Sequence, residues 1–183
     1  MISESRIKFY PLQINDAFAI VFKTVIDERG TLTRIWEENS VLDKFELRQA
    51  SIVRNLSSGT LRGLHFQAEP YSESKIIQCA FGKAFDVVVD LRKNSTTYMQ
   101  HIGIEIGPNC EYQGLFIPQS CAHGYLTLDP DSTLIYFMNN SYSPKHSLGV
   151  RWDDPKLDIK WPSHPSIISE SDSKLPYSSD LEF

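Results

Sequence analysis

Short stretches in which hydrophobic and polar residues alternate recur along this chain. Isoleucines alternate with polar or small residues over 101–106, apolar and polar side chains alternate over 85–92, and residues 134–138 place three apolar side chains on one face. A period of two residues is typical of a β-strand with one buried face. The sequence therefore predicts half-buried strands at these three places.

Two further apolar stretches, 17–25 and 76–81, are also predicted to be strands. Amphipathic helices are scarce, since only 39–45 and 155–157 look helical and both are short. Many short strands at close spacing favour an all-β sandwich or barrel over an α/β fold. Turn-forming residues separate the strands at 57–59, 93–95, 107–109 and 129–131.

The 183 residues contain no internal repeat and no linker, so we expect one domain over residues 1–183. Residues 163–183 are rich in serine, proline and acidic side chains, which is the composition of a loose tail. The residues after Pro176 are expected to be disordered or to lie on the surface of a partner subunit.

The net charge of −5 argues against a nucleic-acid-binding protein, because phosphate contacts need a basic surface. The three cysteines have neither the spacing of a zinc site nor that of a disulfide framework, and Cys79 and Cys121 are expected to be small buried side chains. There is no signal-peptide pattern and no apolar run of membrane-spanning length. We therefore expect a cytoplasmic location and no membrane partner.

The segment Gly59–Gln67 carries the clearest chemistry, with an arginine and a histidine on a short apolar strand. Arg62 offers a fork of donors suited to phosphate oxygens, and His65 can take and return a proton near neutral pH. The pair indicates chemistry on a phosphorylated small molecule. On a regular strand the two side chains would point to opposite faces, so a shared site requires a bulge or bend at Gly63.

Motifs spread from Asp27 to Asp172 occur in an order that resembles the nucleoside-diphosphate-4-keto-6-deoxysugar epimerases, the family of dTDP-4-dehydrorhamnose 3,5-epimerase. Because several motifs follow one another in register, the resemblance covers nearly the whole chain. The motifs are Asp27–Gly30, Gly59–Gln67, Gly82–Arg92, Phe116–Tyr125, Tyr136 with Pro144, Gly149–Pro155, Ile159–Pro162 and Ile168–Asp172.

This resemblance implies a cupin-type jelly-roll barrel, or double-stranded β-helix, with short peripheral helices and a ligand in its mouth. It implies that part of the tail 163–183 folds over the barrel. It also implies a homodimer that exchanges N-terminal strands, so that residues 29–34 reach a neighbour's site. The expected reaction needs neither a cofactor nor a metal.

The implied substrate is a nucleoside-diphosphate-4-keto-6-deoxyhexose, epimerised at C5, C3 or both in deoxysugar biosynthesis. Epimerisation beside a ketone needs a base, a group that holds the enolate oxygen and an acid on the opposite face. The resemblance assigns His65 as the base, supported by Asp172. It assigns Lys75 to the C4 oxygen and Tyr136 as the acid.

Six further residues are expected to bind the substrate. Arg62 would hold the diphosphate, and His123 with Asp86 would form a second polar pair in the pocket. The motifs add Arg29, Gln49 and Gln67 to this group.

Each main candidate also has a structural interpretation. His65 could be a satisfied strand histidine, Lys75 a solvated lysine in a polar stretch, and Tyr136 a core aromatic beside apolar neighbours on its face. Asp172 lies in a segment whose composition suggests a tail.

The chain departs from the family pattern at places that hold the nucleotide base. The early motif has Thr31, Leu32 and Arg34 where two aromatics and an acid are usual. Further departures are Ser51 in place of an asparagine and Ser171 in place of a lysine. These changes put thymidine in doubt and make CDP or GDP sugars live options, whereas the reaction class is unaffected.

Three alternatives stay open at this level. A metal-dependent cupin would need more ligands than His65 and His123 supply. A related 3,4-ketoisomerase would act on the same substrates, but the His65, Lys75 and Tyr136 set favours epimerisation. A non-catalytic sugar-binding jelly roll would need no His–Asp pair.

Overall fold

The computed structural model describes residues 6–37 and 45–181. These residues form strands almost throughout, with one short α-helix and one 3₁₀ turn. The strands are β1 (Ile7–Pro11), β2 (Phe18–Phe22), β3 (Thr24–Asp27), β4 (Gly30–Thr33), β5 (Gln49–Arg54), β6 (Thr60–Gln67), β7 (Lys75–Phe81), β8 (Ala84–Asp90), β9 (His101–Ile106), β10 (Gly114–Ile117), β11 (Cys121–Thr127), β12 (Thr133–Met138), β13 (Ser147–Gly149) and β14 (Ile167–Ile168). The helical elements are α1 (Glu170–Ser173) and η2 (Ser178–Asp180).

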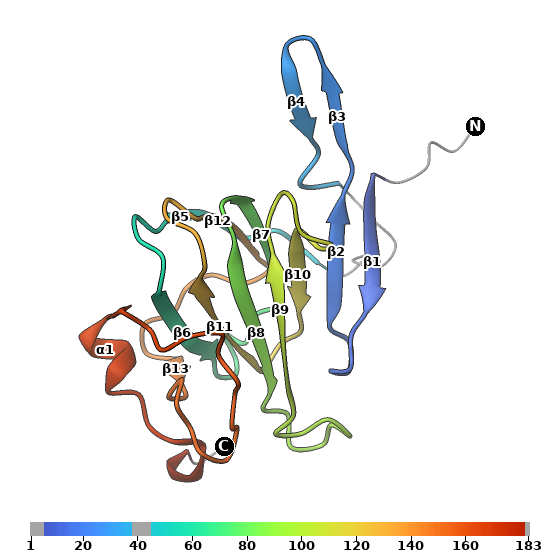
Figure 1. The fold of residues 1–183 in the computed structure, drawn as a ribbon. Helices are drawn as coiled ribbons and strands as arrows, with labels where there is room; N and C mark the ends of the chain where they lie inside the picture. The colour runs from blue at the N-terminus through green and yellow to red at the C-terminus, as the bar shows by residue number, and fades with distance from the viewer. Residues whose placement is uncertain (1–5, 38–44, 182–183) are drawn as a thin grey trace.

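Two sheets pack against each other and form the body of the protein (Figure 1). One has the strand order β1-β2-β10-β7-β12-β5, and the other has the order β13-β6-β11-β8-β9, with β14 beside β6. Every pairing in the two sheets is antiparallel except that of β14 with β6. This confirms the predicted all-β jelly-roll class, with one correction. The strands form two separate sheets rather than one closed barrel.

The strands predicted over 76–81, 101–106 and 134–138 are confirmed as β7, β9 and β12. The stretch 17–25 divides into β2, which joins the first sheet, and β3, which leaves it. The helix expected over 39–45 falls almost entirely outside the described residues. The helix expected over 155–157 is wrong, because these residues form a turn.

The core between the sheets is built from the inward faces of both. It holds Ile77 and Leu115 from the first sheet and Val88 and Tyr125 from the second, each with no exposed surface. Cys79 and Cys121 are buried here as expected, and burial raises the pKa of each thiol to about 12. Neither thiol is therefore reactive at neutral pH.

Strand β8 differs from its half-buried prediction, because it is buried on both faces. Its alternating apolar side chains Val87 and Val89 face outward, against a second cluster that includes Leu157 and Trp161 from the C-terminal segment. Its other face turns toward the interior and carries Asp86. An acid survives there because it is paired with a histidine, as described below.

The C-terminal segment is ordered through Leu181, so its prediction as a loose tail is wrong. It adds β14 to the edge of β6, forms α1 and ends near η2. Ser178 is buried, and its backbone N–H donates to Asp154 Oδ2 at 2.5 Å. Apolar contacts across the outer face of the second sheet explain why this polar composition still folds.

The predicted bulge at Gly63 is confirmed. In the pairing of β6 with β11, His65 is opposite His123 and Arg62 is opposite Tyr125, so β6 has one residue more than its partner. Gly63 adopts φ of +121°, and a Cβ there would lie 2.5 Å from Gly124 Cα. Only glycine fits this position. The bulge turns Arg62 and His65 toward the same cavity.

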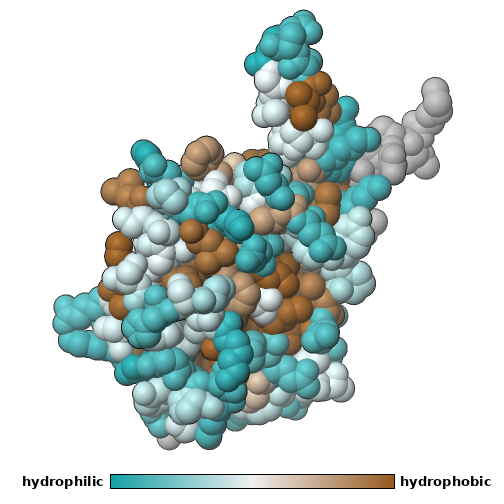
Figure 2. Space-filling model, in the orientation of Figure 1, coloured by the Kyte–Doolittle hydropathy of each residue, from teal (hydrophilic) through white to brown (hydrophobic). Residues whose placement is uncertain are grey.

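Strands β3 and β4 form a hairpin that projects from the body (Figure 1). Its apolar side chains are exposed, with Ile26 at 75% and Leu32 at 61%, and Figure 2 shows this apolar spot standing clear of the two sheets. Among the described residues, no helix is both long and apolar enough to cross a membrane.

Replacing Gly63 by alanine is expected to reduce the free energy of unfolding by about 2–4 kcal/mol, because the new Cβ meets backbone atoms of β11. Gly30→Ala is a matched control, since Gly30 also has a positive φ of +127° but has no atom within 4 Å of the added Cβ. It should cost about 1–2 kcal/mol. Urea unfolding of both variants measures the difference, and equal losses would contradict the steric explanation.

Candidate active site

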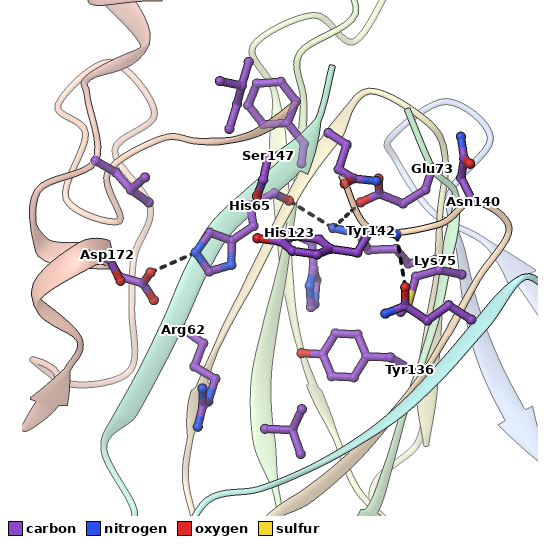
Figure 3. Close-up of a pocket in the computed structure, with 18 of the residues that line it drawn as sticks. Arg62, His65, Glu73, Lys75, His123, Tyr136, Asn140, Tyr142, Ser147 and Asp172 are labelled. Carbon is purple, nitrogen blue, oxygen red and sulfur yellow. Dashed lines mark hydrogen bonds and ion pairs between the residues drawn. The ribbon is translucent and has the colours of Figure 1, made fainter. Parts of the chain in front are cut away.

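A cavity of about 640 Å³ opens beside β6, and its walls come from both sheets and from the C-terminal segment. This volume is within the usual range for a small-molecule site. Figure 3 shows its polar side chains converging from β6, β7, β11, β12 and α1. The cavity brings together Arg62, His65, Lys75, Tyr136 and Asp172, which are far apart in the sequence.

His65 is held by a carboxylate from the far end of the chain. Its Nε2 lies 2.9 Å from Asp172 Oδ1, and the imidazole is 43% exposed toward the cavity. An ionised carboxylate accepts, so Nε2 carries the proton of the neutral ring and Nδ1 keeps its lone pair. The pairing that the resemblance implied is therefore present, and Nδ1 is the nitrogen able to accept a proton.

Asp172 is fixed from several sides. Its Oδ2 accepts from the backbone N–H of Gly63 at 3.1 Å, and its own N–H donates to Ser169 Oγ at 3.0 Å, which caps α1. Burial alone would raise the pKa of Asp172, but the hydrogen bonds from His65 and Gly63 outweigh it and leave that pKa lowered. Asp172 is therefore ionised at neutral pH and stabilises a charged imidazole.

Tyr136 faces His65 and Arg62 across the cavity (Figure 3). Burial raises the pKa of its hydroxyl well above the ordinary value, and the neighbouring Tyr125 and Asp86 raise it further. The phenol is thus protonated at neutral pH and is a hydrogen donor. The interpretation of Tyr136 as only a core aromatic is wrong, because its ring also lines the cavity.

Lys75 is buried rather than solvated, with 8% of its surface exposed. Its Nζ lies 3.1 Å from Glu73 Oε1 and donates to the backbone carbonyl of His65 at 3.2 Å. Glu73 also lines the cavity and is a site residue that the sequence analysis missed. The available signal was an acid two residues before the candidate lysine.

Arg62 is steadied by a second residue that the sequence analysis missed. Its Nε donates to Asn55 Oδ1 at 2.9 Å, and the buried Tyr125 hydroxyl donates to the same oxygen at 3.1 Å. The Asn55 amide in turn donates to the backbone carbonyl of Ser132. No spacing pattern in the sequence linked Asn55 to Arg62, since the contact depends on how β5 leads into the turn before β6.

His123 and Asp86 form a second histidine–aspartate pair, 2.8 Å apart. His123 lines the cavity, and its ring lies edge-on to Tyr136 with centroids 5.9 Å apart. Asp86 has no exposed surface and does not line the cavity, so His123 is the member of this pair that a ligand in the cavity would meet. Burial raises the pKa of Asp86, and the charge of His123 opposes that rise.

The remaining expected binding residues divide into three cases. Gln49 lines the cavity, and its Oε1 accepts from the backbone of Tyr142. Gln67 also lines it, but its amide is already satisfied by the backbones of Tyr71, Ser141 and Ser143. Arg29 lies on the β3–β4 hairpin, 83% exposed and paired with Asp27, and does not line this cavity.

Among residues 6–37 and 45–181, no three metal-ligating side chains gather in one place. His65 and His123 each engage an aspartate of their own.

Comparisons with known proteins find similarity to one family along nearly the whole chain. A family model described as dTDP-4-dehydrorhamnose 3,5-epimerase matches residues 11–180. The protein of that name from Sinorhizobium fredii is 40% identical over 173 residues, which cover 92% of this chain and 88% of the relative.

Solved structures of epimerases have a similar fold. That of dTDP-4-dehydrorhamnose 3,5-epimerase from Bacillus anthracis, with TDP and PPi bound, is 34% identical and has a TM-score of 0.87, covering 93% of this chain and 99% of the other. A 3'-monoepimerase from Streptomyces bikiniensis is 26% identical with a TM-score of 0.84, covering 92% of this chain and 86% of the other.

The lowered pKa of Asp172 predicts how stability depends on pH. A carboxylate with a lowered pKa stabilises the fold above its unfolded pKa of about 4, and the contribution is lost as pH falls through the lower folded value. Asp172→Asn should therefore lower the free energy of unfolding by about 1–3 kcal/mol at pH 7, and the difference from the unaltered protein should shrink below about pH 4.

Asp158→Asn is the matched control, because Asp158 is a 70% exposed aspartate whose carboxylate pairs with Lys160. Urea unfolding at pH 7 and at about pH 3.5 makes the comparison. A loss for Asp172→Asn that stays constant with pH would contradict the role given to its charge.

Proposed function

This chain belongs to the dTDP-4-dehydrorhamnose 3,5-epimerase family of sugar-nucleotide isomerases, and on that basis we propose that it epimerises C5, C3 or both of a nucleoside-diphosphate-4-keto-6-deoxyhexose. The observation that supports this most is the His65–Asp172 pair facing the Tyr136 hydroxyl across one cavity. A base and an acid on opposite sides of a ligand are what inversion at carbon requires.

The reaction begins at His65. Its Nδ1 removes the proton from the carbon beside the C4 ketone, and the electrons of that C–H bond move into the enolate. Asp172 stabilises the imidazolium that forms and keeps the ring in the productive tautomer. Lys75 donates to the enolate oxygen, where negative charge develops.

Tyr136 then completes the inversion. Its hydroxyl gives a proton to the carbon from the opposite face, and the enolate electrons form the new C–H bond. Because burial raises the pKa of this phenol, it is a donor only to a strong base such as an enolate. His65 releases its proton to solvent and Tyr136 regains one, so the protein ends the cycle unchanged.

The diphosphate is assigned to Arg62, whose guanidinium is exposed at the cavity while Asn55 holds its Nε. The identity of the nucleotide base is a separate part of the proposal. The relatives carry dTDP in their names. Thr31, Leu32 and Arg34 stand where two aromatics and an acid are usual, so CDP and GDP sugars remain alternatives to dTDP sugars.

Which carbon is inverted, C3, C5 or both, is a further part of the proposal. The curated relatives are named 3,5-epimerases, whereas a 3'-monoepimerase has the same fold. Both C3 and C5 lie next to the ketone carbon, so one base can serve both after the sugar turns. The fold alone therefore does not select the carbon.

Incubation with dTDP-, CDP- and GDP-4-keto-6-deoxyglucose in heavy water tests the proposal. We expect deuterium to enter C5, C3 or both with at least one of the nucleotides, and proton NMR identifies which. His65→Ala should reduce exchange at least about 10³-fold, because the base is lost, while the affinity for the nucleotide sugar changes little. Exchange that survives in His65→Ala, or that is absent from the unaltered protein with all three sugars, would contradict the proposal.

We further propose a homodimer in which the β3–β4 hairpin reaches a second copy. The hairpin projects from the body, and its apolar side chains are exposed in the single chain. Arg29 at its tip would then serve the neighbour's site, which accounts for its distance from the cavity of its own chain.

Ile26→Asp should therefore weaken the dimer, because it places a charge on a surface that becomes buried. Sedimentation velocity over a range of concentrations measures the dissociation constant of the dimer, which should rise at least about tenfold. Leu56→Asp, at a 70% exposed position away from the hairpin, is the control and should leave the dimer intact. Equal behaviour of the two variants would contradict the role of the hairpin.

A further inference from the structure

Glu73 and Lys75 form an ion pair inside the cavity. The Lys75 Nζ lies 3.1 Å from Glu73 Oε1, and the two side chains are 10% and 6% exposed. Surface ion pairs contribute little, but a pair this far from water fixes both the position and the charge of its members. Both side chains line the cavity in which the proposed reaction takes place, so the geometry of the pair bears on the chemistry (Figure 3).

The hydrogen-bond donors of Lys75 can be accounted for individually. An ammonium has three N–H groups and no acceptor. One reaches Glu73 Oε1, and a second reaches the backbone carbonyl of His65, the residue whose ring is the proposed base. The third has no protein acceptor among the described residues and is free for a ligand. Glu73 therefore helps to decide where this third donor points.

Glu73 is itself held firmly. The segment before β7 is tied down by Ser74, whose N–H donates to Asn139 Oδ1 at 2.7 Å, and by Ser72, whose carbonyl accepts from Gln119 and Asn140. The second carboxylate oxygen of Glu73 is buried and has no hydrogen-bond partner among residues 6–37 and 45–181. A purely structural ion pair would be expected to satisfy both oxygens.

The charges around Lys75 explain why it needs a partner. Glu73 is the carboxylate in contact, and Asp86 from β8 acts at longer range. The other titratable or charged groups that line the site are Arg62 and His65 on β6, His123 on β11, Tyr136 on β12, Tyr142, and Asp172 on α1. Asp86 is already hydrogen-bonded to His123, so Glu73 is the carboxylate that directly compensates the charge of Lys75.

We infer that Glu73 is a positioning residue of this reaction, which keeps Lys75 cationic and aims its free N–H at the ketone oxygen of the substrate. The inference deepens the proposed function and rests on it. Glu73 acts through Lys75 and takes no proton from the substrate. Without the carboxylate, the enolate would form opposite an amine that is more easily neutralised.

Glu73→Gln tests the inference, because glutamine keeps the shape and one oxygen acceptor but removes the charge. We expect kcat to fall about 10- to 100-fold while KM stays within about threefold. We also expect the alkaline fall of kcat to begin at lower pH, since a carboxylate beside an ammonium favours the charged form.

Glu73→Asp keeps the charge on a shorter side chain, and should return the alkaline limb to within about half a unit of the unaltered enzyme even if kcat recovers only in part. Glu105→Gln is the matched control, since Glu105 pairs with Lys83 at 3.3 Å, is 52% exposed and does not line the cavity. It should leave kcat and the pH profile unchanged.

An unshifted alkaline limb in Glu73→Gln, with kcat within about twofold, would overturn the inference, and so would a shift of equal size in Glu73→Asp. A loss confined to thermal stability would likewise overturn it, because a structural role would not move the pH profile. The variants are compared with unaltered enzyme that catalyses deuterium exchange. Failure of that enzyme to exchange deuterium counts against the proposed function instead.

Discussion

The hydrogen bond between His65 and Asp172 joins residues 107 positions apart, and the geometry of the site depends on it. It closes the C-terminal segment over the cavity that opens between the two sheets. The same carboxylate also accepts from Gly63, the residue that bends β6. One acid therefore ties together the orientation of the imidazole, the bulge that turns it inward and the segment that forms one wall of the cavity. A charged acceptor suits this role because such hydrogen bonds are shorter and stronger than neutral ones.

Around this pair, the site is organised as three side-chain pairs, each of which contains one carboxylate, rather than as isolated polar groups. His65 faces Asp172, His123 faces Asp86 and Lys75 faces Glu73. Each pair lies at the wall of a cavity inside an apolar sandwich, where an unpaired charge would be costly. The phenol of Tyr136 stands among them as a neutral donor, because burial opposes its ionisation. A substrate that carries a developing negative charge would meet a cation and a donor already in place.

Packing explains why the site is rigid enough for this arrangement. The inner core joins the two sheets, and the C-terminal segment adds a second apolar layer over the outside of β8. Strand β8 is thereby buried on both faces and holds Asp86 behind His123 without access to water. The hairpin β3–β4 is the exception, since its apolar side chains Ile26 and Leu32 are largely exposed in the described part of the chain.

The sequence by itself determined the local features. Alternation placed β9 and β12, and an apolar stretch placed β7. The residues around Gly63 required the bulge that the structure contains, because one strand cannot direct Arg62 and His65 to one side without it. Motif resemblance assigned His65 and Asp172 to one pair. The roles of Glu73 and Asn55 were decided only by tertiary structure, because hydrophobic periodicity does not show which side chains meet in the folded chain. Tertiary structure likewise decided that the C-terminal segment folds and that it covers the outward face of β8. A polar composition folds when a distant apolar surface is available to cover, and only the packed chain reveals that surface.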